Sequence, residues 1–172
     1  MGCKGAEMNA EEITTDDFHP IDIVEHLAHF HAWDFDRIED NQIAVIIDGA
    51  WANYALSLAW HPHDETLRMI CTFDMDPPED RLPLLYDVLN RTNDKNWSGA
   101  FSLWREQSMM VYRYGLNLTG GATASAVQIE DIVGAAVAAC ERFYPAFQLV
   151  CWGDSTPQEA MLVAMEEAFG RA

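Results

Sequence analysis

Two runs in the first half of the chain alternate between apolar and smaller or polar residues, and this two-residue period is the strongest constraint on the fold. The apolar face of residues 53–61 comprises Tyr54, Leu56, Leu58 and Trp60, and that of residues 66–75 comprises Leu67, Met69, Cys71 and Phe73. A β-strand places alternate side chains on opposite faces of a sheet. Turn-forming residues at 48–49 and 62–64 separate these runs from each other and from residues 42–48. The sequence therefore predicts an antiparallel meander.

Four other segments carry apolar residues at helical spacing, beginning near Ile21, Leu82, Ile129 and Met161. Pro20 suits the first turn of the first helix. Two helices have a capping box at their start, in which a Ser or Thr and a Gln or Glu three residues later satisfy free N–H groups. The pairs are Ser125 with Gln128 and Thr156 with Glu159. These segments are predicted to be helices.

Two prolines affect where the helices begin and end. Pro83 either delays its helix to about residue 83 or kinks the first turn, and Pro145 is expected to end the long helix. Strands are also expected at 99–106 and 109–118. The predicted order is α-β-β-β-α-β-β-α plus a C-terminal helix. This order describes an α+β fold with an antiparallel five-stranded sheet packed against helices.

The chain is strongly acidic, with 28 Asp and Glu against 10 Lys and Arg and a formal net charge of −18. This charge repels nucleic-acid phosphates and anionic membrane surfaces, and no stripe of basic residues reverses it locally. The longest wholly apolar or small stretch, 132–140, is far shorter than a membrane-spanning helix. We therefore expect no nucleic acid and no membrane partner, and an attraction to basic partners.

The first residues of the chain are polar and acidic and show no periodicity. We expect residues 1–17 to form a mobile acidic arm and residues 18–172 to form a single domain. The start has no signal-peptide core and no complete myristoylation motif, which favours a cytoplasmic protein. The four cysteines show no CxxC spacing, so free thiols are expected, with Cys71 and Cys140 acting as small hydrophobic residues on apolar faces.

Several local motifs resemble the YbjN family of small bacterial proteins, also called sensory transduction regulators. The motifs are Phe73-Asp74-Met75 before a proline-containing acidic helix start, Leu89-Asn90 with Asn93, 97–101 (WSGAF), 140–148 (CERFYPAFQ) and Trp152-Gly153. The resemblance covers nearly everything after residue 20. It implies a type III secretion chaperone-like fold, frequent dimerisation, and regulatory or protein-binding roles. It implies no catalytic residues and no cofactor.

Histidines and carboxylates are the only candidates for chemistry. The histidines are His26, His29, His31, His61 and His63, and the acidic clusters are Asp34, Asp36, Glu39 and Asp40, and Asp74, Asp76, Glu79 and Asp80. Zinc binds three or four such histidines, but no HExxH-like motif supports a site. The carboxylates fall in predicted turns and helix starts, where solvated charge is the simpler explanation. We therefore assign no catalytic and no metal-binding residues.

An interaction surface is the remaining functional hypothesis. Leu82, Tyr86 and Leu89 form an apolar stripe that belongs either to the core or to a homodimer or partner interface. The aromatic segment 143–147 with Trp152 is interpreted as core, with a partner surface as the alternative. The sequence predicts a non-enzymatic protein-binding or regulatory domain. The alternatives are a small-ligand-binding or metal-dependent enzyme and a chaperone that holds an unfolded segment along its sheet.

Overall fold

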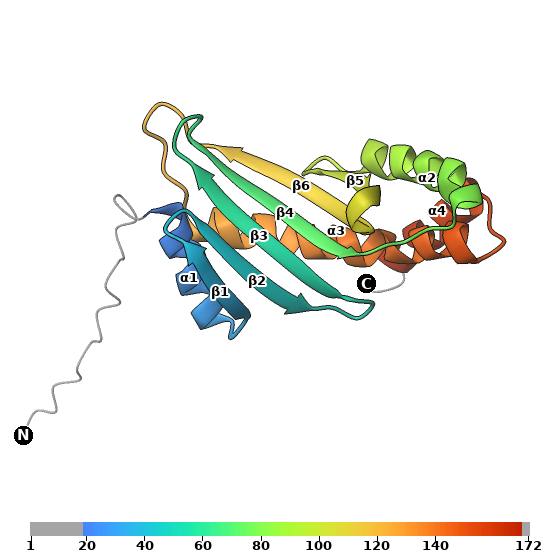
Figure 1. The fold of residues 1–172 in the computed structure, drawn as a ribbon, viewed down its shortest axis with the longest axis horizontal. Helices are drawn as coiled ribbons and strands as arrows, with labels where there is room; N and C mark the ends of the chain where they lie inside the picture. The colour runs from blue at the N-terminus through green and yellow to red at the C-terminus, as the bar shows by residue number, and fades with distance from the viewer. Residues whose placement is uncertain (1–18, 170–172) are drawn as a thin grey trace, which may run out of the picture.

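The structure, a computed structural model, describes residues 19–169 and is built on one twisted antiparallel sheet (Figure 1). The predicted arm at 1–17 lies outside the described residues. The sheet has six strands in the order β1-β2-β3-β4-β6-β5. The strands are β1 (Asp34–Glu39), β2 (Gln42–Asp48), β3 (Asn53–His61), β4 (Thr66–Asp74), β5 (Ala100–Trp104) and β6 (Met109–Asn117). The predicted antiparallel α+β class is confirmed.

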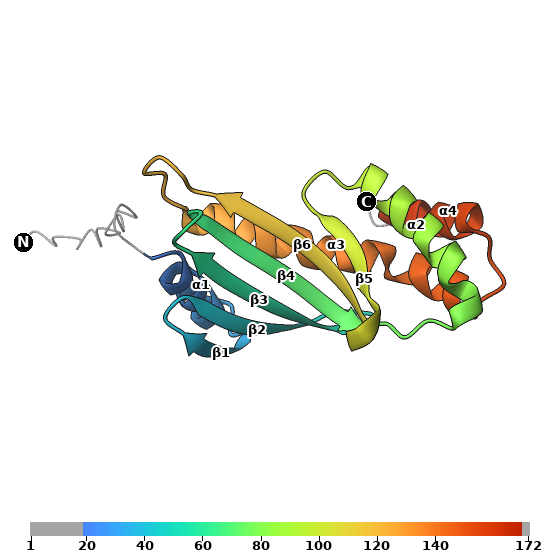
Figure 2. The same ribbon diagram turned by 45° about the horizontal axis from the view of Figure 1, so that its top comes forward.

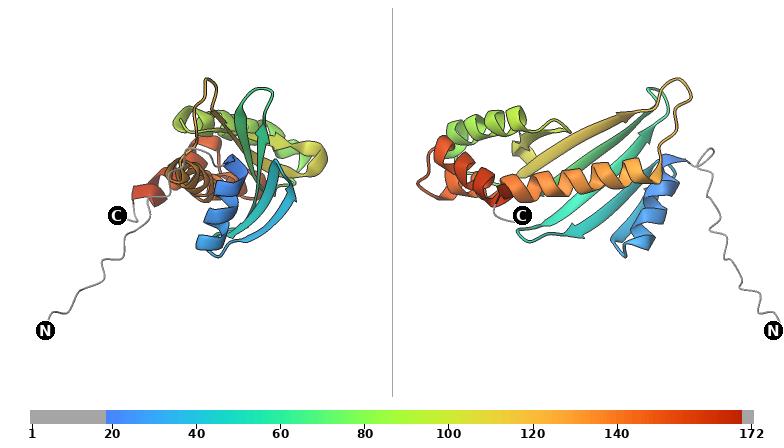
Figure 3. Two further views of the ribbon diagram at one scale, coloured as in Figure 1. Left: turned by 90° about the vertical axis from the view of Figure 1, so that its left-hand side faces the viewer. Right: turned by 180° about the vertical axis from the view of Figure 1, so that it is seen from behind.

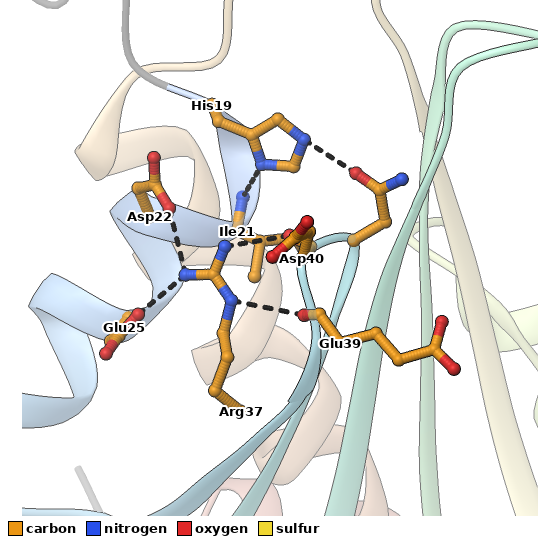
Figure 4. Close-up of polar contacts among 8 residues, drawn as sticks. His19, Ile21, Asp22, Glu25, Arg37, Glu39 and Asp40 are labelled. Carbon is orange, nitrogen blue, oxygen red and sulfur yellow. Dashed lines mark hydrogen bonds and ion pairs between the residues drawn. The ribbon is translucent and has the colours of Figure 1, made fainter.

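The prediction of five strands is wrong, because β1 was assigned to turns. Its sequence, DFDRIE, is dominated by charged residues that hide the alternation of a strand. Charge is typical of an edge strand, where it discourages pairing with another sheet. Arg37 holds β1 in place: Nη1 donates to Asp22 at 2.9 Å and to Glu25 at 2.6 Å, and Nη2 donates to the carbonyl of Asp40 at 2.7 Å (Figure 4).

The helices cover one face of the sheet and extend beyond one end of it. They are α1 (Pro20–Phe30), α2 (Leu82–Lys95), α3 (Ala126–Trp152) and α4 (Pro157–Phe169), with short 3-10 turns η2 (Glu79–Arg81) and η3 (Arg105–Gln107). Seen from behind, α3 runs across the sheet beside α1 (Figure 3). Helices α2 and α4 pack against each other and against α3 beyond the sheet (Figures 1 and 2). Among residues 19–169, no helix lies on the opposite face of β2, β3 and β4 (Figures 1 and 3).

The proline in α3 does not end the helix as predicted. Helix α3 continues through Pro145 to Trp152, although proline removes one helical hydrogen bond at a cost of about 3 kcal/mol. Its last two turns bury Ala146, Phe147 and Val150 in the core, and this burial offsets the loss. Pro83 follows the first of its two expected alternatives, since it is the second residue of α2 after η2.

Both predicted capping boxes are present. Ser125 Oγ accepts from the backbone N–H of Gln128 at 3.1 Å, and the Gln128 side chain accepts from the N–H of Ser125 at 3.0 Å. Thr156 and Glu159 make the same reciprocal pair at the start of α4. These contacts satisfy N–H groups that the first helical turn leaves free. Local side-chain chemistry therefore determines where both helices begin.

Three cysteines lie in the core, and Cys71 and Cys140 behave as the small hydrophobic residues that the sequence predicts. Their sulfur atoms, from β4 and α3, are 3.7 Å apart, and both side chains are fully buried. Contact with Cys71, together with burial, raises the pKa of Cys140 far above its usual value. Burial raises the pKa of Cys151 to about 11. Cys140 and Cys151 are therefore protonated near neutral pH.

These thiols are expected to react with an aromatic disulfide reagent only after unfolding, because the reactive species is the exposed thiolate. In a Cys3→Ser background, which removes the thiol outside the described residues, the native protein should release almost none of the coloured thiolate product. Addition of guanidinium should release three equivalents, one for each of Cys71, Cys140 and Cys151. Rapid labelling of the native protein would contradict the buried positions.

Alkaline pH is expected to destabilise the fold, because folded groups retain protons that the unfolded chain releases. Burial, with a hydrogen bond to Glu141, also raises the pKa of Tyr54. Ordinary pKa values are 9.0 for cysteine and 10.0 for tyrosine, so the contribution of these groups to stability is fully present below about pH 9 and is lost as pH rises beyond it. Denaturant titrations at increasing pH measure this fall, and Tyr54→Phe should reduce its slope above pH 10. A flat profile would contradict the expectation.

Candidate interaction surfaces

One edge of the sheet, at β5, is blocked by a side chain of α2. Asn93 Oδ1 accepts from the backbone N–H of Phe101 at 2.7 Å, and Asn93 Nδ2 donates to the carbonyl of Phe101 at 3.0 Å. The Asn93 amide thus makes the pair of hydrogen bonds that a neighbouring strand would make. Covering an edge in this way prevents another strand from adding to it. The edge at β5 is therefore a poor place for a partner strand.

The other edge, at β1, is protected by charge and irregularity. Its register shifts between Arg37 and Glu39, and a bulge of this kind twists an edge strand away from regular pairing. Asp34 and Asp36 are exposed on the same strand. Neither edge offers a regular row of free backbone groups. A partner of this sheet is therefore left with the face that the helices do not cover.

The face opposite the helices, which we call the open face, consists of the outward side chains of β2, β3 and β4 (Figure 1). Its central positions are Ala44, Ile46, Ala55, Ser57, Ala59, Ile70 and Thr72. A solvated face of an antiparallel sheet normally carries polar residues. Here Lys and Glu are absent from these three strands, and Ile46 is 39% exposed. The centre of the open face is therefore apolar, and polar side chains such as Gln42, His61 and Arg68 lie around it.

The sequence placed Ala55, Ser57 and Ala59 opposite the apolar face of their strand, and the structure confirms that arrangement. The functional interest of these residues was nevertheless missed. The signal was present in the composition: outward positions of a strand facing water are expected to carry charge, and these carry methyl and hydroxyl groups. Sequence spacing alone could not show that no helix covers them.

Acidic side chains surround the open face on two sides. Asp34 and Asp36 lie on β1, and Asp48 and Asp74 lie at the ends of β2 and β4. All four are exposed, and within residues 19–169 none takes part in an ion pair. The guanidinium of Arg68, on the same face, is paired with Asp64. Arg113 of β6, the register partner of Ile70, is exposed on the same face and adds one positive charge on its β6 side. The arrangement therefore leaves net negative charge beside the apolar centre, on its β1 side and at one end.

The predicted stripe on α2 divides between core and surface. Leu82 and Leu89 are each 7% exposed and pack inside the protein, whereas Tyr86 is 46% exposed. On another side of α2, Arg91 and Lys95 line a shallow groove against Met161, Leu162 and Met165 of α4. The structure of one chain does not test the dimer interface, which stays a prediction, but only Tyr86 of the three residues offers substantial surface.

The aromatic segment of α3 is mainly core, as interpreted from the sequence. Phe143 and Phe147 are buried, and Phe147 lies 5.4 Å from Phe101 between ring centroids. Tyr144 is half-buried and stacks on the exposed ring of Trp51 at 6.1 Å. Trp152 is exposed at the end of α3. This segment therefore contributes chiefly to stability.

The histidines do not converge on one point. His31 Nε2 lies 2.6 Å from Glu130 Oε1, and His26 and His29 are exposed on α1. His61 is the last residue of β3, and His63 lies in the turn that follows. Within residues 19–169, no group of three or more His, Cys, Asp or Glu side chains is arranged to hold a metal ion. In the same range no helix is long and apolar enough to cross a membrane.

The first acidic cluster differs from its predicted position, whereas the second lies at a strand end and a helix start as expected. Asp34, Asp36 and Glu39 belong to β1 and not to turns, whereas Asp40 lies in the turn that follows. Of the second cluster, Asp74 ends β4, and Glu79 and Asp80 belong to η2, where Glu79 pairs with Arg105. These carboxylates lie at the surface. They provide no enclosed pair for acid–base chemistry, so the enzyme hypothesis has no candidate site among them.

Comparisons with known proteins agree with the resemblance read from the sequence. Residues 20–149 match the model of the YbjN family, described as "Putative bacterial sensory transduction regulator". A solved structure, YbjN of E. coli, titled "a putative transcription regulator", superposes with a TM-score of 0.50 at 10% identity, covering 87% of this chain and 93% of that one. At this identity the structural likeness shows the fold alone. No curated protein matches the sequence.

Proposed function

Since the chain belongs to the YbjN family, we propose that it is a non-enzymatic regulator that acts by binding another protein on its open face. The observation that carries this proposal is the apolar centre of the open face on β2, β3 and β4, which no helix within the described part of the chain covers. Exposed apolar surface bounded by polar residues is typical of interaction sites. The family's description as a regulator supports the same conclusion.

The manner of binding that we propose is chaperone-like, in the sense that the sheet holds a segment of its partner. The two protected edges support binding on the face over strand addition. We also propose a cytoplasmic location, in keeping with the sequence-based expectation. The negative charge of the chain then favours solubility and disfavours contact with nucleic acids.

Site-specific photocrosslinking in the native cell tests this function. A benzoylphenylalanine residue replacing Ala55 on the open face is expected to give a reproducible crosslink to one protein. The same residue replacing Ala138, which is exposed on α3, is the matched control and should not give that crosslink. The Ala55 crosslink should also disappear when Ala59→Tyr fills the neighbouring position. No protein adduct at Ala55 would refute binding on this face.

Homodimerisation through α2 is a further part of the proposal. The exposed ring of Tyr86 is the one residue of the predicted stripe that could insert into a second copy. Tyr86→Asp is therefore expected to convert a dimer into a monomer, because an aspartate in an apolar contact would be left without a partner. Sedimentation velocity measures the change, with the exposed neighbour Asn90→Asp as control. A wild-type protein that stays monomeric at high concentration would contradict this interface.

A further inference from the structure

We infer that the partner segment held on the open face is an amphipathic α-helix with basic flanks. This inference rests on the proposed function and specifies the chemistry of its partner. It comes from three observations: the shape of the open face, the lack of backbone hydrogen-bonding groups there, and the acidic residues around it.

On the open face the outward residues of β3 include a row of small side chains, Ala55, Ser57 and Ala59, which we call the trough. Ala55 lies between Ile46 of β2 and Thr72 of β4, and Ser57 lies between Ala44 and Ile70. Ala59 lies between Gln42 and Arg68. Larger side chains thus flank the row on both sides at the first and third positions, and on the β4 side at the second. The trough follows the strand, and a helix packed on a sheet presents a stripe of apolar side chains to such a surface.

The face of a sheet also determines what kind of segment can bind there. Strand N–H and C=O groups point within the sheet, toward neighbouring strands, and not out of its face. An extended segment lying on the open face would therefore gain no backbone hydrogen bonds. It would also lose water from its own N–H and C=O groups, which is costly. A helix satisfies these groups internally, so a helix is favoured over an extended strand.

The charge of the partner follows from the acidic residues beside the trough. Asp34 and Asp36 lie along its β1 side, and Asp48 and Asp74 lie at one end. None of the four has an ion-pair partner within residues 19–169, so Lys or Arg on the flank of a bound helix that faces β1 would meet unpaired carboxylates, whereas the opposite flank would lie toward Arg113. Acidic flanks on the helix would be repelled. Complementary charges of this kind select a partner and orient it.

Two synthetic peptides test this inference on the full chain. Both have about 18 residues, or five helical turns, with the same stripe of Leu and Ala; one carries Lys on its flanks and the other Glu. Fluorescence anisotropy measures binding, and circular dichroism reports helix formation. We expect the Lys peptide to bind at least roughly tenfold more tightly than the Glu peptide and to become helical on binding.

Because the whole chain carries a charge of −18, the controls must separate local fit from general attraction. Ala55→Tyr with Ala59→Tyr fills the trough without changing charge, and should weaken the Lys peptide roughly tenfold. Ala138→Tyr on α3 should not. Asp34→Asn with Asp36→Asn should weaken binding more than Asp131→Asn with Glu166→Gln, which removes equal charge from exposed positions on α3 and α4.

Each other outcome overturns the inference in a distinguishable way. If the Lys peptide binds the Ala55→Tyr, Ala59→Tyr variant as tightly as the wild-type protein, it is attracted only by the overall negative charge of the chain. Tighter binding of the Glu peptide would mean an acidic partner. Failure of both peptides, together with a protein crosslink at Ala55, would exclude a basic helix while leaving the proposed protein-binding function intact. Loss of the crosslink itself would overturn that function as well.

Discussion

Replacing Glu141 by alanine is expected to lower the free energy of unfolding by about 3 kcal/mol, because three hydrogen bonds converge on its carboxylate. The donors are the Tyr54 hydroxyl at 2.5 Å and the backbone N–H groups of Ala50 at 3.1 Å and Trp51 at 3.2 Å. They join α3 to the turn between β2 and β3. The Tyr54 side chain is fully buried, so its hydroxyl would lose its partner away from water.

Denaturant titration of a matched set of variants measures this contribution. Asp131→Ala removes an exposed carboxylate from the same helix and should change stability by less than about 0.5 kcal/mol. Tyr54→Phe removes one of the three donors, and combining it with Glu141→Ala in a double-mutant cycle isolates their coupling. Equal stability of the Glu141→Ala and Asp131→Ala variants would show that the carboxylate contributes little.

The same cluster explains Gly49 at the β2–β3 turn. A Cβ added there would lie 2.3 Å from both Glu141 Oε1 and the Tyr54 ring, and 2.9 Å from the carbonyl of Ala52. The sequence indicated a turn at Asp48-Gly49 but gave no reason for glycine beyond its turn preference. That reason is tertiary, since Glu141 approaches the turn from a helix 92 positions further along the chain. Local patterns cannot predict such a contact.

Other elements were predictable because their causes are local. Strands β2 and β3 begin and end at the residues that the sequence predicted, since alternation and turn residues define both. Strand β1 was not predicted, because its charged residues reflect its place at the edge of the sheet. It is held there by hydrogen bonds from Arg37 to Asp22 and Glu25, which are distant in the sequence. The open face was predictable only in part. Its residues were assigned to the correct side of β3, but its exposure depends on where the helices pack.

Helix α3 shows most clearly that local sequence cannot predict every element boundary. From local chemistry alone, Pro145 predicts the end of the helix. The helix continues past Pro145 where its next residues are buried. Phe147 is fully buried, with its ring 5.4 Å from that of Phe101 and 6.4 Å from that of Phe73 between centroids. If burial holds the last two turns together, their stability should depend strongly on this one side chain.

Phe147→Ala is therefore expected to destabilise the protein by about 4 kcal/mol, through lost burial and the cavity left behind. Phe147→Leu should cost less, because it keeps most of the volume. Leu162→Ala, at a position 61% exposed on α4, is the control and should have little effect. Hydrogen exchange of α3 locates the change: faster exchange confined to residues after Pro145 would show that burial of Phe147 overrides the proline. Unchanged exchange there would mean that the distal turns are held by other contacts, such as those with α2 and α4.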